Sequence, residues 1–155
     1  MIPDHSSARE EFTNIRVTRE GKWFTGVKEI VNWKVISHFK QHLFRDEKGI
    51  YIYQTFRQFS EKGYITVEGP LLAVFRVEAD KIILDSLDEI GEDAADVIVN
   101  TEDELPYVLY PRLRCYASVP AAVAPYFSEV ITETAGGFLV YGRPVRREAI
   151  SSWVK

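Results

Sequence analysis

The sequence predicts an α+β fold of two pseudo-repeated subdomains, each a bent antiparallel sheet covered by one helix. Many short stretches alternate between apolar and polar residues and are separated by glycine, proline or charged residues, which predicts strands. A helix-like stretch that leads through a glycine into a strand occurs twice, 88 positions apart. A period of this kind favours a duplicated architecture.

The two copies of this pattern are residues 31–53 and residues 119–141, which align without gaps. The identical pairs are Val31 and Val119, Val35 and Val123, Phe39 and Phe127, Gly49 and Gly137, and Tyr53 and Tyr141. These positions form the apolar face of a helix, the glycine that ends the connection, and the strand beyond it. The repeat therefore indicates architecture and not chemistry.

The composition is that of an ordinary globular chain, with 155 residues of which 46% are apolar and 27% are charged. This length predicts one domain, or two small subdomains that share a core. The net charge of −4 argues against a nucleic-acid partner, and a single cysteine excludes an internal disulfide. No apolar run reaches the ~18 residues that span a bilayer, and residues 1–14 lack the features of a signal peptide. We therefore expect a cytoplasmic protein with no membrane span and a flexible N-terminal arm over residues 1–14.

The first subdomain is expected over residues 15–69. Its expected elements are strands at 15–18 and 22–24, a helix that begins after Asn32, a turn at 45–49, and strands at 50–53 and 64–67. Asn32 is a suitable helix cap because its side-chain oxygen can accept from the first free N–H groups. The apolar face of the helix contains Val35, Ile36, Phe39 and Leu43.

The second subdomain is expected over residues 70–142, after a boundary at Gly69-Pro70. Its expected elements are a hairpin of 71–77 and 81–84, an acidic solvated segment at 85–104, a long strand at 107–117, a helix from Ser118 to Gly136-Gly137, and a strand at 138–141. Proline breaks the ladder at Pro111 and kinks the helix at Pro125. Residues 143–155 form a basic tail, which we expect to dock on the body as a short helix.

One face of the strand at 107–117 combines aromatic side chains with arginines. Residues two apart in a strand share a face, and this spacing groups Tyr110, Arg112, Arg114 and Tyr116. Arginine beside tyrosine is suited to hold an anion or a planar polar ligand. The alternative is that the arginines pair with the acids of 85–104 and hold that segment down.

Two residues of the first subdomain are candidates for the same ligand site. If the subdomains pack through their strands, Trp23 and Arg16 reach the crevice beside the arginine face. The alternative for Trp23 is ordinary packing in the core.

The histidines and the single cysteine predict no metal site and no catalytic site. His38 and His42 have a spacing that can chelate a metal, but Lys40 stands between them and no third histidine is near. Cys115 lies on an apolar strand face, which predicts a core residue and not a nucleophile. Because no motif for nucleotide, dinucleotide or serine-hydrolase chemistry occurs, we assign no catalytic residue, no metal and no cofactor.

The chain resembles an uncharacterised bacterial family, the domain of unknown function 1285. The residues that carry the resemblance are Ile15-x5-Gly21-x-Trp23-x2-Gly26-x3-Ile30, Val35-x3-Phe39-x3-Leu43-x2-Asp46-x2-Gly49-x-Tyr51, Val67-Glu68-x-Pro70, Leu105-Pro106-Tyr107-Val108 and Gly136-Gly137. The resemblance covers residues 14–142. It implies a duplicated α+β fold with a second half like a pleckstrin-homology barrel, a ligand crevice between the halves, and a signalling or regulatory role.

The chain departs from the family pattern at two places. Family members tend to have Asp where this chain has Gly69, and a Gly-Leu-Glu-Ala-Arg stretch where it has residues 111–115. The second departure lies in the strand with the arginine face, so the ligand of a shared crevice is expected to differ.

The sequence leaves three functional hypotheses open. The first is a non-catalytic module that binds a small anionic or polar metabolite between its halves, through the six residues named above. The second is an interaction protein or homodimer that docks a partner through its strand edges and the 143–155 tail. The third is an unrecognised enzyme, which requires Glu68, Asp85 or a histidine to converge on the arginine face.

Overall fold

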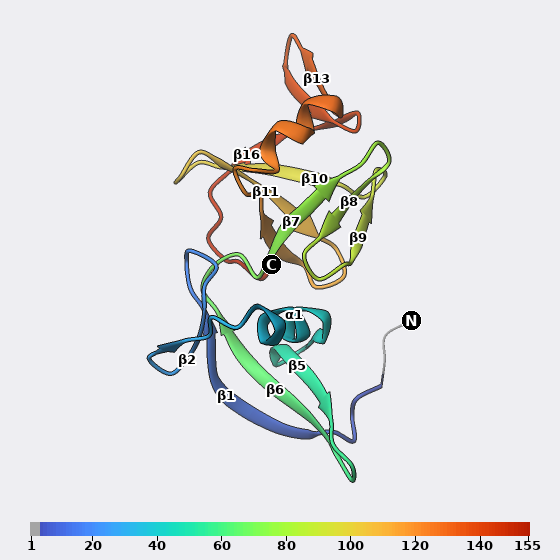
Figure 1. The fold of residues 1–155 in the computed structure, drawn as a ribbon. Coiled ribbons are helices and arrows are strands. Elements are labelled where there is room, and N and C mark those ends of the chain that lie inside the picture. The colour runs from blue at the N-terminus through green and yellow to red at the C-terminus, as the bar shows by residue number, and fades with distance from the viewer. Residues whose placement is uncertain (1–3) are drawn as a thin grey trace.

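The computed structural model describes residues 4–155 and consists mostly of strands (Figure 1). Two large curled sheets lie one above the other, with the helix α1 (Trp33–Gln41) between them. No helix within residues 4–155 is long and apolar enough to cross a membrane. The predicted α+β class with two sheet-based halves is confirmed, whereas the details of both sheets differ from the prediction.

The first sheet has six strands in the described residues, in the order β3-β2-β1-β6-β5-β4. These strands are β1 (Arg9–Val17), β2 (Trp23–Thr25), β3 (Lys28–Glu29), β4 (Leu43–Asp46), β5 (Gly49–Thr55) and β6 (Ser60–Val67). Strands β1 and β6 pair in parallel, so the expectation of a purely antiparallel sheet was wrong. Strand β1 begins at Arg9, so residues 9–14, expected in the arm, belong to the sheet.

Helix α1 starts as predicted, but its predicted apolar face packs only in part, since the side chain of Val35 is exposed. The Asn32 side chain accepts from the N–H of Lys34 over 3.0 Å, which confirms the cap. Ile36 and Phe39 pack on the core, and the Phe39 ring lies 5.9 Å from that of Trp23. The helix ends before Leu43, which begins β4 and is fully buried.

The second large sheet has seven strands in the described residues, in the order β16-β10-β11-β12-β7-β8-β9. These are β7 (Leu72–Val77), β8 (Lys81–Leu84), β9 (Glu89–Gly91), β10 (Asp96–Asn100), β11 (Leu105–Tyr110), β12 (Cys115–Ser118) and β16 (Arg146–Glu148). The predicted β7–β8 hairpin is confirmed, but the acidic segment is not a plain solvated loop. It contains β9 and β10, because Val97 and Ile98 bury their apolar side chains there.

The helix expected from Ser118 to Gly136-Gly137 is absent. A short 3₁₀ helix, η1 (Ala124–Glu129), is followed by a small sheet of β13 (Ile131–Thr134), β14 (Gly137–Val140) and β15 (Arg143–Pro144). Prolines at 120 and 125 remove backbone donors, and the β-branched residues of 130–132 favour a strand. A second covering α-helix was therefore the wrong expectation for this half.

The 88-residue period nevertheless matches the structure. Strand β4 covers 43–46 and β13 covers 131–134, while β5 and β14 begin at Gly49 and Gly137. Each copy is thus a helical segment followed by a hairpin. Their surroundings differ, because the first hairpin continues into the six-stranded sheet and the second belongs to the small sheet.

One apolar core joins the two halves. Val17, Trp23 and Leu43 of the first half belong to the same buried cluster as Leu72 and Val108 of the second. The C-terminal tail docks as predicted, but as a strand instead of a helix. Strand β16 pairs in parallel with β10, and the side chain of Trp153 is buried against the rings of Tyr107 and Tyr116.

Candidate functional site

The four residues of the expected arginine face do not share a face. The chain reverses over residues 111–114, so the strand alternation stops at Tyr110 and restarts at Cys115. Tyr110 pairs with Cys115 across the hairpin, while Tyr116 pairs with Leu109. Since paired residues lie on one face and neighbours on opposite faces, Tyr110 and Tyr116 point to opposite sides of the sheet.

The remaining predicted ligand residues are also dispersed. Trp23 is buried in the main core, as in the alternative interpretation. The Arg16 guanidinium lies 4.9 Å from the Phe24 ring centroid and 3.9 Å from Glu68. Arg114 is exposed in the reversal, with a φ of 52°. Of the six residues, the structure keeps only Tyr110 and Arg112 in direct contact.

Arg112 bridges the two halves. Its Nε donates to the Tyr110 hydroxyl over 2.7 Å, and its Nη1 donates to the main-chain oxygen of Leu43 over 3.0 Å. Its Nη2 lies 3.6 Å from the Asp88 carboxylate, and its guanidinium carbon lies 5.4 Å from the Phe44 ring centroid. Pairing with the acidic segment, the alternative foreseen from the sequence, is thus confirmed for Arg112. Its side chain is still 40% exposed.

Burial keeps the Tyr110 hydroxyl neutral. Its pKa is raised by burial, although the adjacent Arg112 charge acts in the opposite direction. The hydroxyl therefore remains an acceptor for Arg112 at neutral pH and orients the guanidinium.

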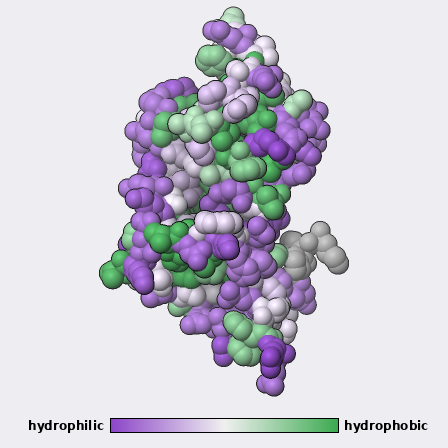
Figure 2. Space-filling model, in the orientation of Figure 1, coloured by the Kyte–Doolittle hydropathy of each residue, from purple (hydrophilic) through white to green (hydrophobic). Residues whose placement is uncertain are grey.

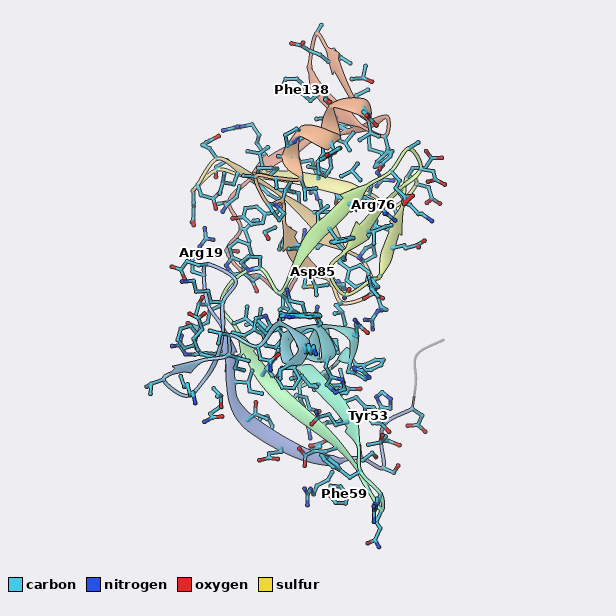
Figure 3. The ribbon with its side chains drawn as sticks, viewed as in Figure 1. Arg19, Tyr53, Phe59, Arg76, Asp85 and Phe138 are labelled. Atoms are coloured by element: carbon cyan, nitrogen blue, oxygen red, sulfur yellow. The ribbon has the colours of Figure 1, made fainter. Side chains whose placement is uncertain are left out.

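Further polar contacts cross the same junction. Lys40 at the end of α1 pairs with Asp85 over 2.5 Å, and Asp85 also accepts from the N–H of Ala73 over 3.0 Å. Figure 3 shows Asp85 on the side of the second half that faces α1. Arg45 donates to the main-chain oxygens of Leu113 and Lys155 over 3.1 and 2.7 Å. The two carboxylates that an enzyme would require beside the arginine face have other partners. Asp85 pairs with Lys40, and Glu68 lies near Arg16.

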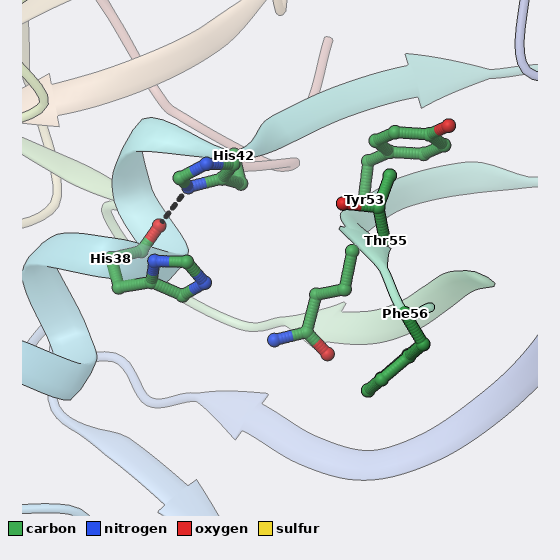
Figure 4. Close-up of a pocket in the computed structure, with 6 residues that line it drawn as sticks. His38, His42, Tyr53, Thr55 and Phe56 are labelled. Carbon is green, nitrogen blue, oxygen red and sulfur yellow. Dashed lines mark hydrogen bonds between the residues drawn. The ribbon is translucent and has the colours of Figure 1, made fainter. Parts of the chain in front are cut away.

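A cavity of about 240 Å³ with a mixed polar and apolar lining lies at the end of α1 (Figure 4). Its lining residues are His38, His42, Tyr53, Gln54, Thr55 and Phe56. The Nδ1 of His42 donates to the main-chain oxygen of His38 over 2.6 Å. The two rings lie 4.2 Å apart, but no group of three metal-binding side chains occurs among residues 4–155.

An aromatic box on the first sheet was missed by the sequence analysis. It consists of Phe44, Tyr51 and Tyr53, and it holds His5. The His5 ring stacks on Tyr53 with centroids 3.6 Å apart and planes 9° apart, and it meets the edge of Phe44 at 4.7 Å. The Nδ1 of His5 is hydrogen-bonded to the Tyr51 hydroxyl over 2.9 Å. The alternation of Ile50, Tyr51, Ile52 and Tyr53 was a signal that two tyrosines share an outer face.

A buried ionic group lies next to this box. Lys62 is only 8% exposed and pairs with Asp46 over 3.1 Å, and the Tyr64 hydroxyl donates to Asp46 over 2.6 Å. Burial by itself raises the pKa of Asp46, but hydrogen bonds from Tyr64, the Lys48 N–H and Lys62 outweigh it, and the net pKa is lowered. Asp46 is therefore ionised at neutral pH and balances the Lys62 charge.

An apolar cavity of about 240 Å³ lies between the second sheet and the small sheet. Its lining residues are Val97, Val99, Pro106, Val119, Ala124, Phe127, Ile131, Phe138, Val140 and Val145. It contains no charged residue, so it does not suit the anionic ligand predicted from the sequence.

Cys115 is a core residue, as predicted. It is fully buried, and burial raises the pKa of its thiol to about 12. The thiol is therefore protonated and shielded at neutral pH.

The fold matches two solved structures. A DUF1285 family protein from Silicibacter pomeroyi DSS-3 superposes with a TM-score of 0.67 at 18% identity, over 89% of this chain and 81% of that one. A DUF1285 family protein from Shewanella baltica OS155 superposes with a TM-score of 0.50 at 13% identity, over 76% of this chain and 92% of that one. This chain has the DUF1285 fold. No family model and no curated protein matches the sequence.

The likeness to DUF1285 proteins confirms, at the level of the fold, the resemblance seen in the sequence motifs. The structure also gives a reason for one departure from the DUF1285 pattern. At Gly69 a Cβ atom would lie 1.9 Å from the main-chain oxygen of Thr18, so this position has no room for an Asp side chain as the backbone now runs.

Proposed function

We propose that this chain is a non-catalytic module that binds a small anionic or polar ligand at the junction of its two halves. Arg112 and Tyr110 would hold the ligand, and binding would serve a regulatory or signalling role. Of the residues first considered, Arg114, Tyr116, Trp23 and Arg16 are no longer needed for this site. The proposal keeps two further expectations, a second half like a pleckstrin-homology barrel and a cytoplasmic location.

The observation that carries the proposal is the incomplete pairing of Arg112. Two of its nitrogen atoms have hydrogen-bond partners at 2.7 and 3.0 Å, whereas Nη2 faces Asp88 at 3.6 Å, outside hydrogen-bond range. A carboxylate or phosphate offers oxygen atoms that can approach Nη2 more closely. The guanidinium is already oriented by Tyr110 and Leu43, which reduces the entropy that binding would cost.

A ligand at this point would act on the contact between the halves. It would compete with Asp88, which lies after β8, for the Nη2 of Arg112. Arg112 also contacts Leu43 and Phe44 of the first half. A change in the position of its side chain would therefore alter contacts in both halves. This arrangement suits a sensor better than an enzyme, since Glu68 and Asp85 face Arg16 and Lys40 instead.

The test is a thermal-shift screen against phosphates, carboxylates and nucleotides. A ligand at about a hundred times its Kd stabilises the fold by ~2.7 kcal/mol, which raises Tm by several degrees. We expect a hit that is lost in Arg112→Ala and kept in Arg114→Ala. Arg114 is the matched control, because it lies two residues away and its side chain is exposed. A hit that survives in Arg112→Ala, or a library without hits, would contradict the proposal.

A second candidate, an interaction module, is favoured by an exposed apolar patch. Val27, Val31 and Trp33 are 98%, 77% and 70% exposed. Figure 2 shows hydrophobic surface beside α1 and at the tip of the β2–β3 hairpin. Exposed patches of this kind often mark contact surfaces. In the docked tail, β16 pairs with β10 and Trp153 is buried, so these parts of the tail are already engaged within the chain.

The interaction candidate is tested by the molar mass in solution. Light scattering over a range of protein concentrations would show a dimer that Trp33→Lys dissociates. The matched control is Phe59→Lys, which removes an exposed aromatic side chain from the β5–β6 turn, away from the patch. A wild type that stays monomeric at all concentrations would rule out self-association through this surface.

A further inference from the structure

The aromatic box of Phe44, Tyr51 and Tyr53 is formed by strands that do not depend on His5. Phe44 pairs with Tyr51 between β4 and β5, and Tyr53 pairs with Lys62 between β5 and β6. The ladder therefore holds the three rings in place on the outer face of the sheet, opposite the buried Ile50 and Ile52. The backbone positions of the three walls are therefore set by strand pairing and not by His5.

The occupant of the box comes from a separate segment. His5 precedes β1, and its main-chain oxygen accepts a hydrogen bond from the N–H of Ala8 over 3.0 Å. The neighbouring Ser6 N–H bonds only locally, to the Asp4 side chain over 3.0 Å. These two hydrogen bonds are local and do not belong to the ladder of the sheet, so the His5 ring can leave the box while the sheet stays intact.

The charges around the box favour a neutral ring. Lys62 lies 5.1 Å from the Tyr51 ring centroid, and Arg112 lies 5.4 Å from that of Phe44. Asp46 balances Lys62, and Asp4 is the acidic neighbour of His5. Burial and the Lys62 charge lower the pKa of His5, while Asp4 opposes them weakly. The box thus differs from the aromatic cages that bind quaternary ammonium groups.

We propose that Phe44, Tyr51 and Tyr53 form a binding site for a small molecule with a neutral, planar nitrogen heterocycle, and that His5 is an internal competitor for this site. The contacts of His5 describe the ligand. The His5 ring stacks on Tyr53, meets the edge of Phe44, and has a hydrogen bond between a ring nitrogen and the Tyr51 hydroxyl. The ligand would make the same contacts. This site goes beyond the function proposed above, since it lies in the first half and does not require Arg112.

His5 would inhibit ligand binding by occupying the box itself. A site that is free in only a fraction of the molecules binds with its affinity reduced by that fraction. Removal of the His5 imidazole should therefore raise the affinity for an added heterocycle. If His5 only packed against the sheet, its removal would not create a site that selects planar nitrogen heterocycles.

The experiment compares the wild type, His5→Ala and Ser7→Ala by NMR titration with imidazole and with adenine at about pH 8, where free imidazole is neutral. We expect His5→Ala to bind at least one probe about tenfold more tightly than the wild type, with shifts centred on residues 49–55. Ser7→Ala is the matched control, because Ser7 is exposed in the same segment, and it should behave as the wild type does. Cyclopentanol, a saturated ring with a hydroxyl group, should not bind.

A second variant separates the site from general loosening of the fold. In the His5→Ala background, Tyr51→Phe keeps the ring and removes the hydroxyl, so it should weaken probe binding several-fold without lowering Tm. The proposal is overturned if neither probe binds His5→Ala saturably, if the wild type binds equally well, or if Tyr51→Phe has no effect.

Discussion

Arg112 Nη1 donates a hydrogen bond to the main-chain oxygen of Leu43 over 3.0 Å, and thereby joins the turn between β11 and β12 to the first residue of β4. The same guanidinium bonds Tyr110. A residue first noticed as part of a ligand surface is therefore also a structural bridge, and any ligand experiment on it needs a stability measurement beside it.

Arg112→Ala should lower the free energy of unfolding by about 1–2 kcal/mol, because two hydrogen bonds from a charged group are lost at a partly exposed site. Urea denaturation with a comparison of midpoints measures the effect. Arg114→Ala should change it by less than about 0.5 kcal/mol, as expected for an exposed position. If Arg112→Ala lowered the free energy of unfolding no more than Arg114→Ala does, the hydrogen bonds of Arg112 would not stabilise the fold measurably.

Gly69→Ala should destabilise the fold by about 3 kcal/mol or more, because the new Cβ would overlap the Thr18 oxygen and the backbone would have to move. The matched control is Gly136→Ala, where no atom lies within 4 Å of the added carbon. That variant should stay within about 0.5 kcal/mol of the wild type. Thermal unfolding of the two variants and the wild type measures the difference. Equal Tm values for the two variants would contradict the prediction.

His5 should make stability depend on pH in weakly acidic solution. Its folded pKa lies below the ordinary value of 6.5, so the unfolded chain binds more protons and stability rises with pH between the two pKa values. The contribution is present above pH 6.5 and is lost as the pH falls through the folded pKa. Urea denaturation from pH 5 to 8 should show this slope in the wild type and a smaller one in His5→Ala. Identical slopes would show that His5 titrates normally.

Cys115 should react with a thiol reagent only when the fold opens. It is fully buried and its pKa is raised to about 12, so the thiolate is scarce and inaccessible in the folded state. Labelling with an aromatic disulfide reagent should be slow in buffer and rapid in denaturing urea. Fast labelling of the folded protein would contradict the burial.

Local patterns predicted much of the fold because they report local preferences. The Asn32 cap, the strands around residues 50–53 and 64–67, and the register of the 88-residue repeat depend on backbone donors and on side-chain alternation within a few residues. The same reasoning placed Cys115 in the core. It failed at residues 118–136, where helix-like spacing of apolar residues competed with two prolines and β-branched residues, and a short 3₁₀ helix and a hairpin formed.

The sequence by itself determined the class of fold and the strand-rich pattern, and it contains no motif for nucleotide, dinucleotide or serine-hydrolase chemistry. Only the tertiary structure decided which side chains meet. Tyr110 and Tyr116 separate because a chain reversal over 111–114 restarts the alternation, and Arg112 meets Leu43 because the halves share one core. His5 enters the aromatic box although 46 residues separate it from Tyr51. Contacts between distant segments depend on how sheets curl and pack, and no short-range pattern encodes that geometry.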